Sequence, residues 1–142
     1  MSTEDNKALA RRFYEEVFNK GNLAAVDELC TANYLYHDPS ISVQGPEAFK
    51  QFASVYLTAF PDQQTTIEDL IAEGDTVVVR NTLRATHKGE LMGIPPTGKQ
   101  VTVSAITITR VVNGKAEETW GNADALGMLQ QLGVVRAPGP TS

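Results

Sequence analysis

The chain has 142 residues, of which 42% are apolar and 20% charged, and its formal net charge is −5. This length fits one domain, and the composition is that of a folded globular protein rather than a disordered chain. The acidic charge and the scattered basic residues argue against a nucleic-acid partner, which requires clustered Lys and Arg. Cys30 is the one cysteine, so no internal disulfide is available and we expect a buried, inert thiol.

The N-terminal stretch MSTEDNKALARR is polar and acidic, unlike a signal peptide. No apolar run approaches the roughly 18 residues of a membrane span. We therefore expect a cytoplasmic protein that does not associate with a membrane. No repeat, linker or low-complexity segment divides the chain, so we expect a single domain over residues 1–142, with its core at 4–135 and a disordered tail at 136–142.

The first two predicted helices follow from apolar spacing. Leu9, Phe13 and Val17 recur every four residues and predict a first helix that begins at Ser2 or Thr3. Lys20-Gly21 ends this helix, because Gly adopts the left-handed conformation of a helix C-terminus. A short second helix is expected to begin with Asn22 as its cap and to run to Cys30.

The segment TANYLYHDPS is predicted to be extended up to Pro39. Gly45-Pro46 then begins a third helix, since Pro is well accommodated in the first helical turn, and Pro61 ends it. The apolar residues of this helix form one buried face, made of Phe49, Phe52, Val55, Tyr56 and Phe60.

After Pro61 the apolar periodicity changes from helical to extended. Two hairpins are predicted, one turning at Gly74-Asp75 and one at Asn113-Gly114. A last helix covers Leu126–Leu132. Three helices ahead of a run of antiparallel strands predict an α+β domain, in which the helices cover one face of a curved sheet and leave an internal pocket.

Alternate residues of the strand TVVVRNTLRATH separate into two faces. The mostly apolar face is assigned to the interior and consists of Val77, Val79, Asn81, Leu83, Ala85 and His87. The other face carries Arg80 and Arg84, which we expect to meet solvent or a partner subunit.

His37 and His87 are the two histidines, and histidine is the natural proton-transfer group near neutral pH. Each is either such a group or a hydrogen-bonded structural residue. His37 adjoins Asp38, but neighbours on a strand point to opposite faces, so a direct pair requires a turn at Pro39. The spacing of histidines and acids predicts no metal site. Two kinds of function remain, namely acid/base chemistry in an apolar pocket and ligand binding in that pocket.

The stretch EETWGNADALGMLQQLG ends the last strand and begins the last helix. Asp124 either caps that helix or acts in the pocket. Glu118 and Trp120 share one face of the strand, so both line the cavity or both face a partner sheet. The segment LMGIPP is expected to form an apolar lip, from which Met92 and Ile94 contact a ligand.

These segments together resemble a known family. The matching stretches run from about residue 7 to residue 133 and read FYEEVFNKGN, YHDP, GPEAFKQF, AFPD, TIEDLIAEGDTVVVRNTLRATHKGELMGIPPTGKQV and a closing W…D…LQQLG. The chain resembles the SnoaL-like polyketide cyclases and the related ester cyclases of the nuclear transport factor 2-like superfamily. The resemblance implies a cone of three N-terminal helices on a curved, mainly antiparallel sheet. It also implies an intramolecular aldol ring closure on a methyl ester, with no metal and no cofactor.

The sequence departs from the pattern of the characterised cyclases at the last strand, where they carry His-Arg-Asp-Trp and then Pro-Asp. Laid against this chain without a gap, the histidine falls on Thr119, the catalytic aspartate on Gly121 and the later aspartate on Asp124. Glycine cannot transfer a proton. Glu118, Trp120 and Asp124 match instead the E-x-W-x-x-x-D pattern of ester-cyclase relatives.

Our leading hypothesis is a cofactor-independent enzyme that carries out aldol cyclisation, isomerisation or dehydration on a hydrophobic carbonyl compound. Asp124 would be the base, and His87 or His37 would position or polarise the carbonyl. The expected ligand contacts are Trp120, Met92, Ile94, Tyr56, Phe60 and Asn81.

Two other hypotheses remain open. Gly121 motivates a non-catalytic protein that binds a small apolar molecule. Water activation of the epoxide hydrolase type, known elsewhere in the superfamily from an Asp-Arg-Asp network, would need Arg80 or Arg84 inside the cavity. We also expect a homodimer, because the outer sheet face carries Val78, Thr82, Ile106 and Ile108 alongside charged residues. The resemblance implies the same, since members of the family commonly form dimers or tetramers.

Overall fold

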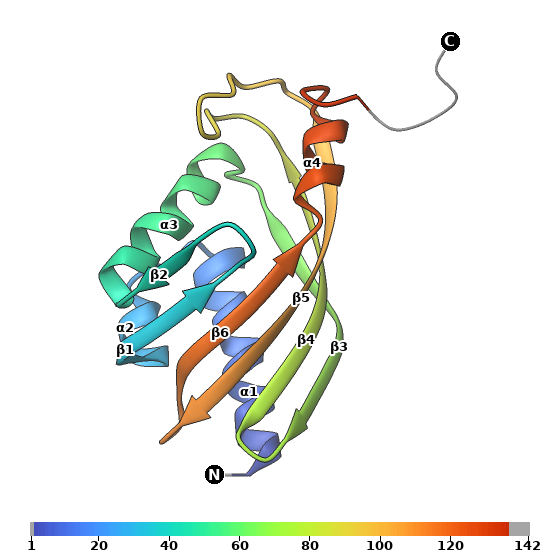
Figure 1. Cartoon of the computed structure of the whole chain (residues 1–142). Helices are drawn as coiled ribbons and strands as arrows, with labels where there is room; N and C mark the ends of the chain where they lie inside the picture. Colours follow the sequence, from blue (N-terminus) through green and yellow to red (C-terminus); the bar gives the residue numbers. More distant parts are fainter. Residues whose placement is uncertain (1, 137–142) are drawn as a thin grey trace.

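The computed structural model describes residues 2–136, so the tail expected at 136–142 lies, except for Arg136, outside the described residues. The described chain is one α+β unit in which helices cover one face of a curved sheet (Figure 1). In chain order the elements are α1 (Thr3–Phe13), η1 (Tyr14–Asn19), α2 (Ala25–Leu29), β1 (Cys30–His37), β2 (Ser42–Gln44), α3 (Pro46–Ala59), β3 (Gln64–Glu73), β4 (Thr76–Thr86), β5 (Gln100–Val112), β6 (Lys115–Ala123) and α4 (Ala125–Gln131).

The first helix begins at a capping box. The Ser2 hydroxyl accepts a hydrogen bond from the Asp5 backbone N–H at 3.0 Å, and the Asp5 carboxylate accepts one from Ser2 N–H at 3.2 Å. The helix continues from α1 into the wider π-helical turn η1, which closes when Lys20 N–H donates to the Glu15 carbonyl at 2.9 Å. The prediction of one helix ending at Lys20-Gly21 is confirmed, with Gly21 at φ +69°.

The second helix starts later than the sequence suggested. Its N-cap is Ala24, without a side-chain hydrogen bond, and helix α2 covers Ala25–Leu29. Asn22 uses its backbone carbonyl instead, which accepts from Ala25 N–H at 3.1 Å. The assignment of Asn22 as a side-chain cap is therefore wrong. Helix α3 begins as predicted, with Pro46 in its first turn. Val55, predicted to lie on its buried face, is 41% exposed instead, because the buried side of the helix runs through Phe49, Ala53 and Ala59.

Within residues 2–136, the strands form one sheet of six with the order β2-β1-β6-β5-β4-β3. The pair β1–β6 is parallel, and the other neighbours are antiparallel. Both predicted hairpins are present, and Asn113 and Gly114 take the positive φ values of +51° and +78° that a tight primed turn requires. The mainly antiparallel sheet is therefore confirmed, and the parallel pair joins the first strand to the last.

The two faces of β4 are those that the alternation predicted. Val77, Val79 and Asn81 are each at most 5% exposed on the inner face, whereas Arg80 and Arg84 are exposed on the outer face. The helices α1, α2 and α3 cover the inner face (Figure 1). No helix of the described residues is long and apolar enough to cross a membrane. The cytoplasmic location stays a prediction.

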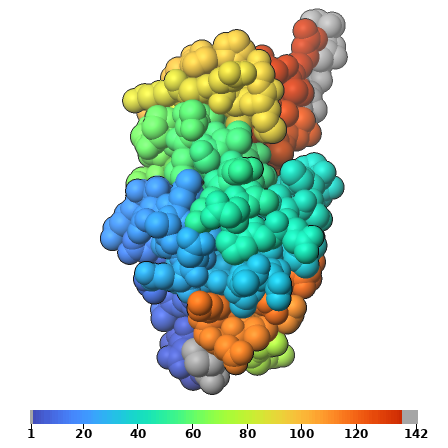
Figure 2. Space-filling model, turned by 90° about the vertical axis from the view of Figure 1, so that its left-hand side faces the viewer, coloured from blue at the N-terminus to red at the C-terminus, as the bar shows by residue number. Residues whose placement is uncertain are grey.

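The loop between β4 and β5 is fastened to the end of α3. The backbone N–H groups of Lys88 and Gly89 both donate to the Ala59 carbonyl, at 2.9 and 3.1 Å. Figure 2 shows this yellow loop lying against the green end of the helix. A Cβ atom on Gly89 would overlap the Thr58 carbonyl oxygen and lie 3.2 Å from Ala59 Cα. The close approach of the two backbones therefore requires glycine at this position.

We predict that Gly89→Ala lowers the free energy of unfolding by about 1–3 kcal/mol, because the added methyl forces the loop away from α3. Urea unfolding at constant pH measures the change. Glu90→Ala, at the exposed neighbouring position, serves as the control and is expected to shift stability by less than about 0.5 kcal/mol. Equal stability of Gly89→Ala and the parent chain would contradict the close packing.

Candidate functional site

A cavity of about 540 Å³ lies between the inner face of the sheet and the helices α1 and α3. This volume falls in the range of small-molecule sites. Most of its wall is apolar and comes from α1, α3, β4 and β5, through residues that include Leu9, Phe13, Phe49, Phe52, Val77, Val79, Leu83 and Val103. The α+β arrangement therefore encloses the internal pocket that the sequence predicted.

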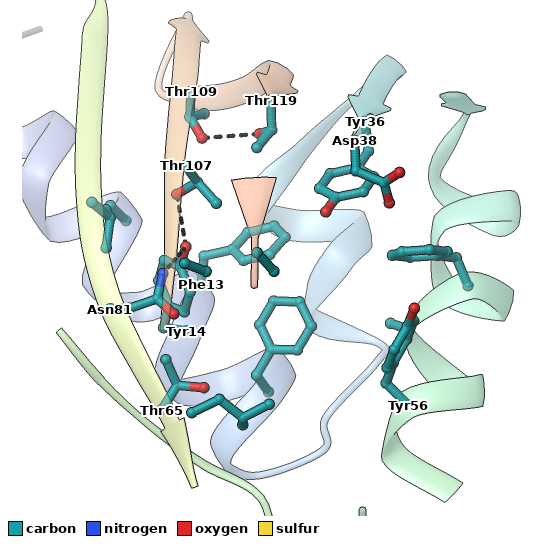
Figure 3. A pocket seen from close by; sticks show the side chains of 18 of the residues that line it. Phe13, Tyr14, Tyr36, Asp38, Tyr56, Thr65, Asn81, Thr107, Thr109 and Thr119 are labelled. Carbon is teal, nitrogen blue, oxygen red and sulfur yellow. Dashed lines mark hydrogen bonds between the residues drawn. The ribbon is translucent and has the colours of Figure 1, made fainter. Parts of the chain in front are cut away.

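A first polar group on the wall centres on Tyr14. Its hydroxyl is 2.7 Å from the Thr107 hydroxyl and accepts a hydrogen bond from the Asn81 side-chain amide at 3.2 Å (Figure 3). Burial raises the pKa of the Tyr14 hydroxyl to about 12, against the lowering effect of the Thr107 hydrogen bond. These hydrogen bonds join the three side chains, so Asn81 reaches the cavity from a position fixed by Tyr14.

A second polar group joins β1 to β5 and β6. The Tyr34 hydroxyl donates to the Thr119 hydroxyl at 2.8 Å, and Thr119 lies 2.9 Å from the Thr109 hydroxyl. Burial raises the pKa of Tyr34 well above its ordinary value. These hydroxyls are therefore engaged in holding the wall together.

A third polar group consists of Tyr36, Asp38 and Tyr56. All three line the cavity, on the side opposite Tyr14 and Thr107 (Figure 3). The Asp38 Oδ1 atom accepts hydrogen bonds from Ser40 N–H and Oγ–H, both at 2.8 Å, and from Ile41 N–H at 3.0 Å. Burial first and the Asp38 charge second raise the pKa values of the Tyr36 and Tyr56 hydroxyls. Both phenols therefore keep their protons at neutral pH.

Asp124 lines the same cavity at the junction of β6 and α4. Its Oδ1 atom accepts a hydrogen bond from Gly127 N–H at 2.9 Å, which is an N-cap contact. The cap and the pocket position, which the sequence left as alternatives, thus coincide in one side chain. Among residues 2–136, the carboxylates lining the cavity are Asp38 and Asp124, and no histidine lines it.

His37 lies on the outer face of the sheet. Its Nε2 atom is 2.7 Å from a Glu118 carboxylate oxygen, its Nδ1 atom is 2.8 Å from the Ser42 hydroxyl, and its ring stacks on Trp120. The hydrogen bond to His37 and then that to Arg110 lower the pKa of Glu118. Because Asp38 points to the other face, His37 and Asp38 do not pair, as strand alternation predicted.

The structure corrects the sequence-based placement of four ligand contacts, because Trp120, Met92, Ile94 and Phe60 do not line the cavity. Trp120 is 42% exposed on the outer face with Glu118, because its neighbours Thr119 and Gly121 take the inward positions on β6. Met92 is 69% exposed at the tip of a turn that Leu91 and Ile94 close through mutual backbone hydrogen bonds. Leu91 takes the buried place below it, so neither Met92 nor Ile94 lines the cavity.

His87 is fully buried, but under the β4–β5 loop rather than at the cavity. Its Nδ1 atom accepts from Thr97 N–H at 3.2 Å and lies 3.0 Å from the Thr97 hydroxyl. Its ring packs against Phe60, which likewise lies outside the cavity wall. No residue from 2 to 136 offers a hydrogen-bond partner to His87 Nε2. In this geometry His87 fastens the loop, and neither histidine reaches a cavity ligand.

Of the other predicted contacts, Tyr56 and Asn81 line the cavity. Sequence reasoning missed Tyr36 and weighed Asp38 only as a partner of His37. The alternation of side chains along β1 could have identified both residues. Because neighbouring residues of a strand point to opposite faces, an outward His37 places Tyr36 and Asp38 on the inner face. Arg80 pairs with Asp69 on the outer face, and Arg84 is exposed there too. This placement rules out the Asp-Arg-Asp network that the epoxide hydrolase hypothesis required.

Comparison with known proteins agrees with this fold. The sequence profile described as SnoaL-like polyketide cyclase matches residues 8–132, and the chain belongs to that family. Aklanonic acid methyl ester cyclase DnrD of Streptomyces peucetius is 32% identical over 148 residues, covering 99% of this chain and 96% of that one. Nogalonic acid methyl ester cyclase of Streptomyces nogalater is 31% identical over 121 residues, covering 82% of this chain and 89% of that one.

Solved structures show the same architecture. TsrD of Streptomyces laurentii superposes with a TM-score of 0.85 at 26% identity, covering 95% of this chain and 99% of that one. IdmH of Streptomyces antibioticus superposes with a TM-score of 0.80 at 30% identity, covering 91% and 99%. An epoxide hydrolase from M. tuberculosis, described as LEH-like, shares the fold alone, at 13% identity and a TM-score of 0.72. The predicted nuclear transport factor 2-like cone is confirmed.

The raised pKa of Tyr14 predicts a loss of stability in alkali. Its hydroxyl titrates at about 12 in the folded protein and near 10 in the unfolded chain. Its contribution is therefore complete below pH 10 and falls as the pH rises towards 12, because the unfolded chain releases its proton first. Urea unfolding between pH 8 and 11.5 measures this slope. Tyr14→Phe is expected to give a shallower slope, and an unchanged slope would contradict the burial of the hydroxyl.

Proposed function

We propose that this protein closes a ring in a hydrophobic carbonyl compound by cofactor-independent acid/base chemistry in the cavity. The observation that carries the proposal is an apolar cavity of about 540 Å³ whose wall includes two carboxylates, Asp38 and Asp124. Membership of the SnoaL-like polyketide cyclase family supports it. Two relatives are named as cyclases of methyl esters, which makes a methyl ester with several carbonyl groups the first substrate class to test.

The proposed base is the Asp124 carboxylate. It removes a proton from a carbon next to a carbonyl, and the electron pair moves onto the carbonyl oxygen to form an enolate. The enolate carbon attacks a second carbonyl of the same molecule, which forms the carbon–carbon bond and leaves an alkoxide. Asp124 returns its proton to that alkoxide. The reaction is an isomerisation that consumes no other reactant, and the apolar wall keeps water from the enolate.

A purely binding role, which Gly121 suggested from the sequence, is less favoured than catalysis. Two carboxylates, Asp38 and Asp124, line the cavity. The hydrogen bond that caps α4 engages one of the two oxygens of Asp124. The chain's family and its named relatives are cyclases. The histidines have no part in the proposed reaction, because His37 lies on the outer face and His87 lies under the loop.

We predict that Asp124→Asn lowers kcat by about 10²–10⁴-fold, the usual contribution of a general base. Asparagine is as good an N-cap as aspartate, so α4 and the thermal stability should be unchanged. The measurement is turnover of aklanonic acid methyl ester and nogalonic acid methyl ester, followed by chromatography and mass spectrometry. A role limited to capping predicts full activity in this variant.

Asp38→Asn is the matched comparison, because asparagine Oδ1 can accept the same three hydrogen bonds. Full activity of Asp124→Asn with loss in Asp38→Asn would move the base to Asp38 and leave the ring closure in place. No turnover of either ester by the unmodified protein would count against a methyl ester substrate. Prolonged binding of the esters without chemical change would favour the non-catalytic binding role.

We also propose a homodimer through an outer patch made of Ile106, Ile108 and Trp120. Their exposed fractions are 48%, 40% and 42%, and they lie on the neighbouring strands β5 and β6, where Ile108 pairs with Trp120. Large adjoining apolar side chains on a sheet face favour burial against another surface. A second copy offers the same patch to a two-fold interface.

We expect Ile108→Glu to convert the dimer to a monomer, since the new charge would have to be buried at the centre of the interface. Sedimentation velocity measures the mass. Val55→Glu places the same charge on α3, at a residue of matched exposure, 41% against 40%, and should stay dimeric. A monomeric parent chain at micromolar concentration would contradict the dimer.

A further inference from the structure

The Tyr36 side chain fills the space above Gly121 on the cavity wall. Strand β1 runs parallel to β6 with Tyr36 opposite Thr119, and the phenol leans over the next inward position on β6. A Cβ atom built on Gly121 would lie 2.8 Å from Tyr36 Oη and 3.4 Å from the ring carbons Cε1 and Cζ. The closest of these contacts is shorter than real Cβ atoms show, so an L side chain at residue 121 and the present position of Tyr36 exclude each other.

The backbone gives no separate reason for glycine at this position. Gly121 lies within strand β6 and is not among the glycines with positive φ. Glycine inside a strand is unfavourable relative to a residue with a side chain. The space needed by the Tyr36 hydroxyl therefore accounts for Gly121.

The Tyr36 hydroxyl differs from the other inward phenols on the same wall. Tyr14 is bonded to Thr107 and Asn81, and Tyr34 donates to Thr119. Among residues 2–136, no hydrogen bond engages the Tyr36 hydroxyl, while its ring is fixed against Phe49 and Phe52 at centroid distances of 5.5 and 5.1 Å. A rigid phenol with an unused O–H, directed into a cavity, is a hydrogen-bond donor available to a ligand.

We propose that Tyr36 is a catalytic residue of this cavity, whose hydroxyl donates a hydrogen bond to the enolate oxygen of the substrate. The inference rests on the proposed ring closure. When Asp124 removes the proton from carbon, the electron pair moves to the carbonyl oxygen, and the Tyr36 O–H stabilises the charge there. The proton stays on Tyr36, and the electron pair returns as the new carbon–carbon bond forms.

The positions of the two groups suit this division of roles. Gly121 lies near the end of strand β6, and Asp124 follows that strand as the N-cap of α4. Both Tyr36 and Asp124 line the cavity. Burial raises the pKa of Tyr36 above its ordinary value, so the donor keeps its proton throughout the range in which a carboxylate acts as base. The Tyr36 hydroxyl thus supplies a hydrogen-bond donor beside Gly121, which has no side chain of its own. The base, Asp124, acts from the end of strand β6.

The test uses alizarin, a hydroxyanthraquinone whose visible spectrum reports its ionisation and whose phenolate mimics an enolate. Bound to the unmodified protein, alizarin should ionise at a lower pH than it does in Tyr36→Phe. We expect the apparent pKa of the bound dye to rise by about one unit or more in the variant, the tenfold effect of one hydrogen bond to a charged oxygen. An equal dye pKa in both proteins would overturn the proposal.

The control is Tyr34→Phe, which removes a hydroxyl from the same strand and face that is already bonded to Thr119. It should lower thermal stability and leave the dye pKa unchanged. With an active ester, Tyr36→Phe should lower kcat by about 100-fold with a smaller change in KM, as loss of one such donor does. A dye shift without turnover of any ester would keep Tyr36 as the donor and reject ring closure. Turnover at the full rate in Tyr36→Phe would reject the donor alone.

The steric coupling gives a second, substrate-free test. Gly121→Ala should lower the free energy of unfolding in the parent chain, because its methyl group meets Tyr36 Oη. In the Tyr36→Phe background the oxygen is gone and the ring carbons lie at 3.4 Å, so the same substitution should be neutral or stabilising. Equal effects of Gly121→Ala in the two backgrounds would show that Tyr36 does not occupy this space.

Discussion

The parallel pairing of β1 with β6 brings the first strand against the last, with Tyr36 opposite Thr119 and His37 opposite Trp120. This register decides which side chains enter the cavity. Tyr34 and Tyr36 face inward and meet Thr119 and Gly121, while His37 faces outward and meets Glu118. A slip of one residue on either strand would exchange the two sets, because strand side chains alternate between faces. The chemistry of the cavity therefore depends on a long-range contact.

The free-energy cost of removing a polar group from water determines where polar groups lie in the cavity wall. The deep hydroxyls occur in bonded groups, such as Tyr14 with Thr107 and Tyr34 with Thr119. Asp38 and Asp124 keep part of their surface exposed to solvent, and in each the Oδ1 atom accepts a hydrogen bond from a neighbouring backbone N–H group. An isolated carboxylate deeper in the apolar wall would lose its charge or destabilise the fold.

Local sequence signals predicted most of the fold. The apolar spacing of the first helix, the Asn113-Gly114 turn and the alternation on β4 depend on neighbours along the chain, and the structure contains all three. The prediction did less well wherever a distant segment decides the outcome. Trp120 is an aromatic residue in a strand of mixed character, and only its pairing with Ile108 and His37 places it outside. His87 shared the inward face of β4, but the loop that returns over it closes it off from the cavity.

Gly121 is a further case in which a distant segment decides the outcome. In the sequence, glycine stands where the characterised cyclases carry their catalytic aspartate, and this favours a binding protein. In the structure the missing side chain is matched by a phenol from β1 that reaches the same place. No local pattern connects residue 36 to residue 121, because their contact exists only once β1 has paired with β6. A carboxylate and a phenol serve different steps, since one accepts a proton and the other stabilises an oxyanion. In the proposed reaction the base is Asp124, which lines the cavity and follows the end of the same strand.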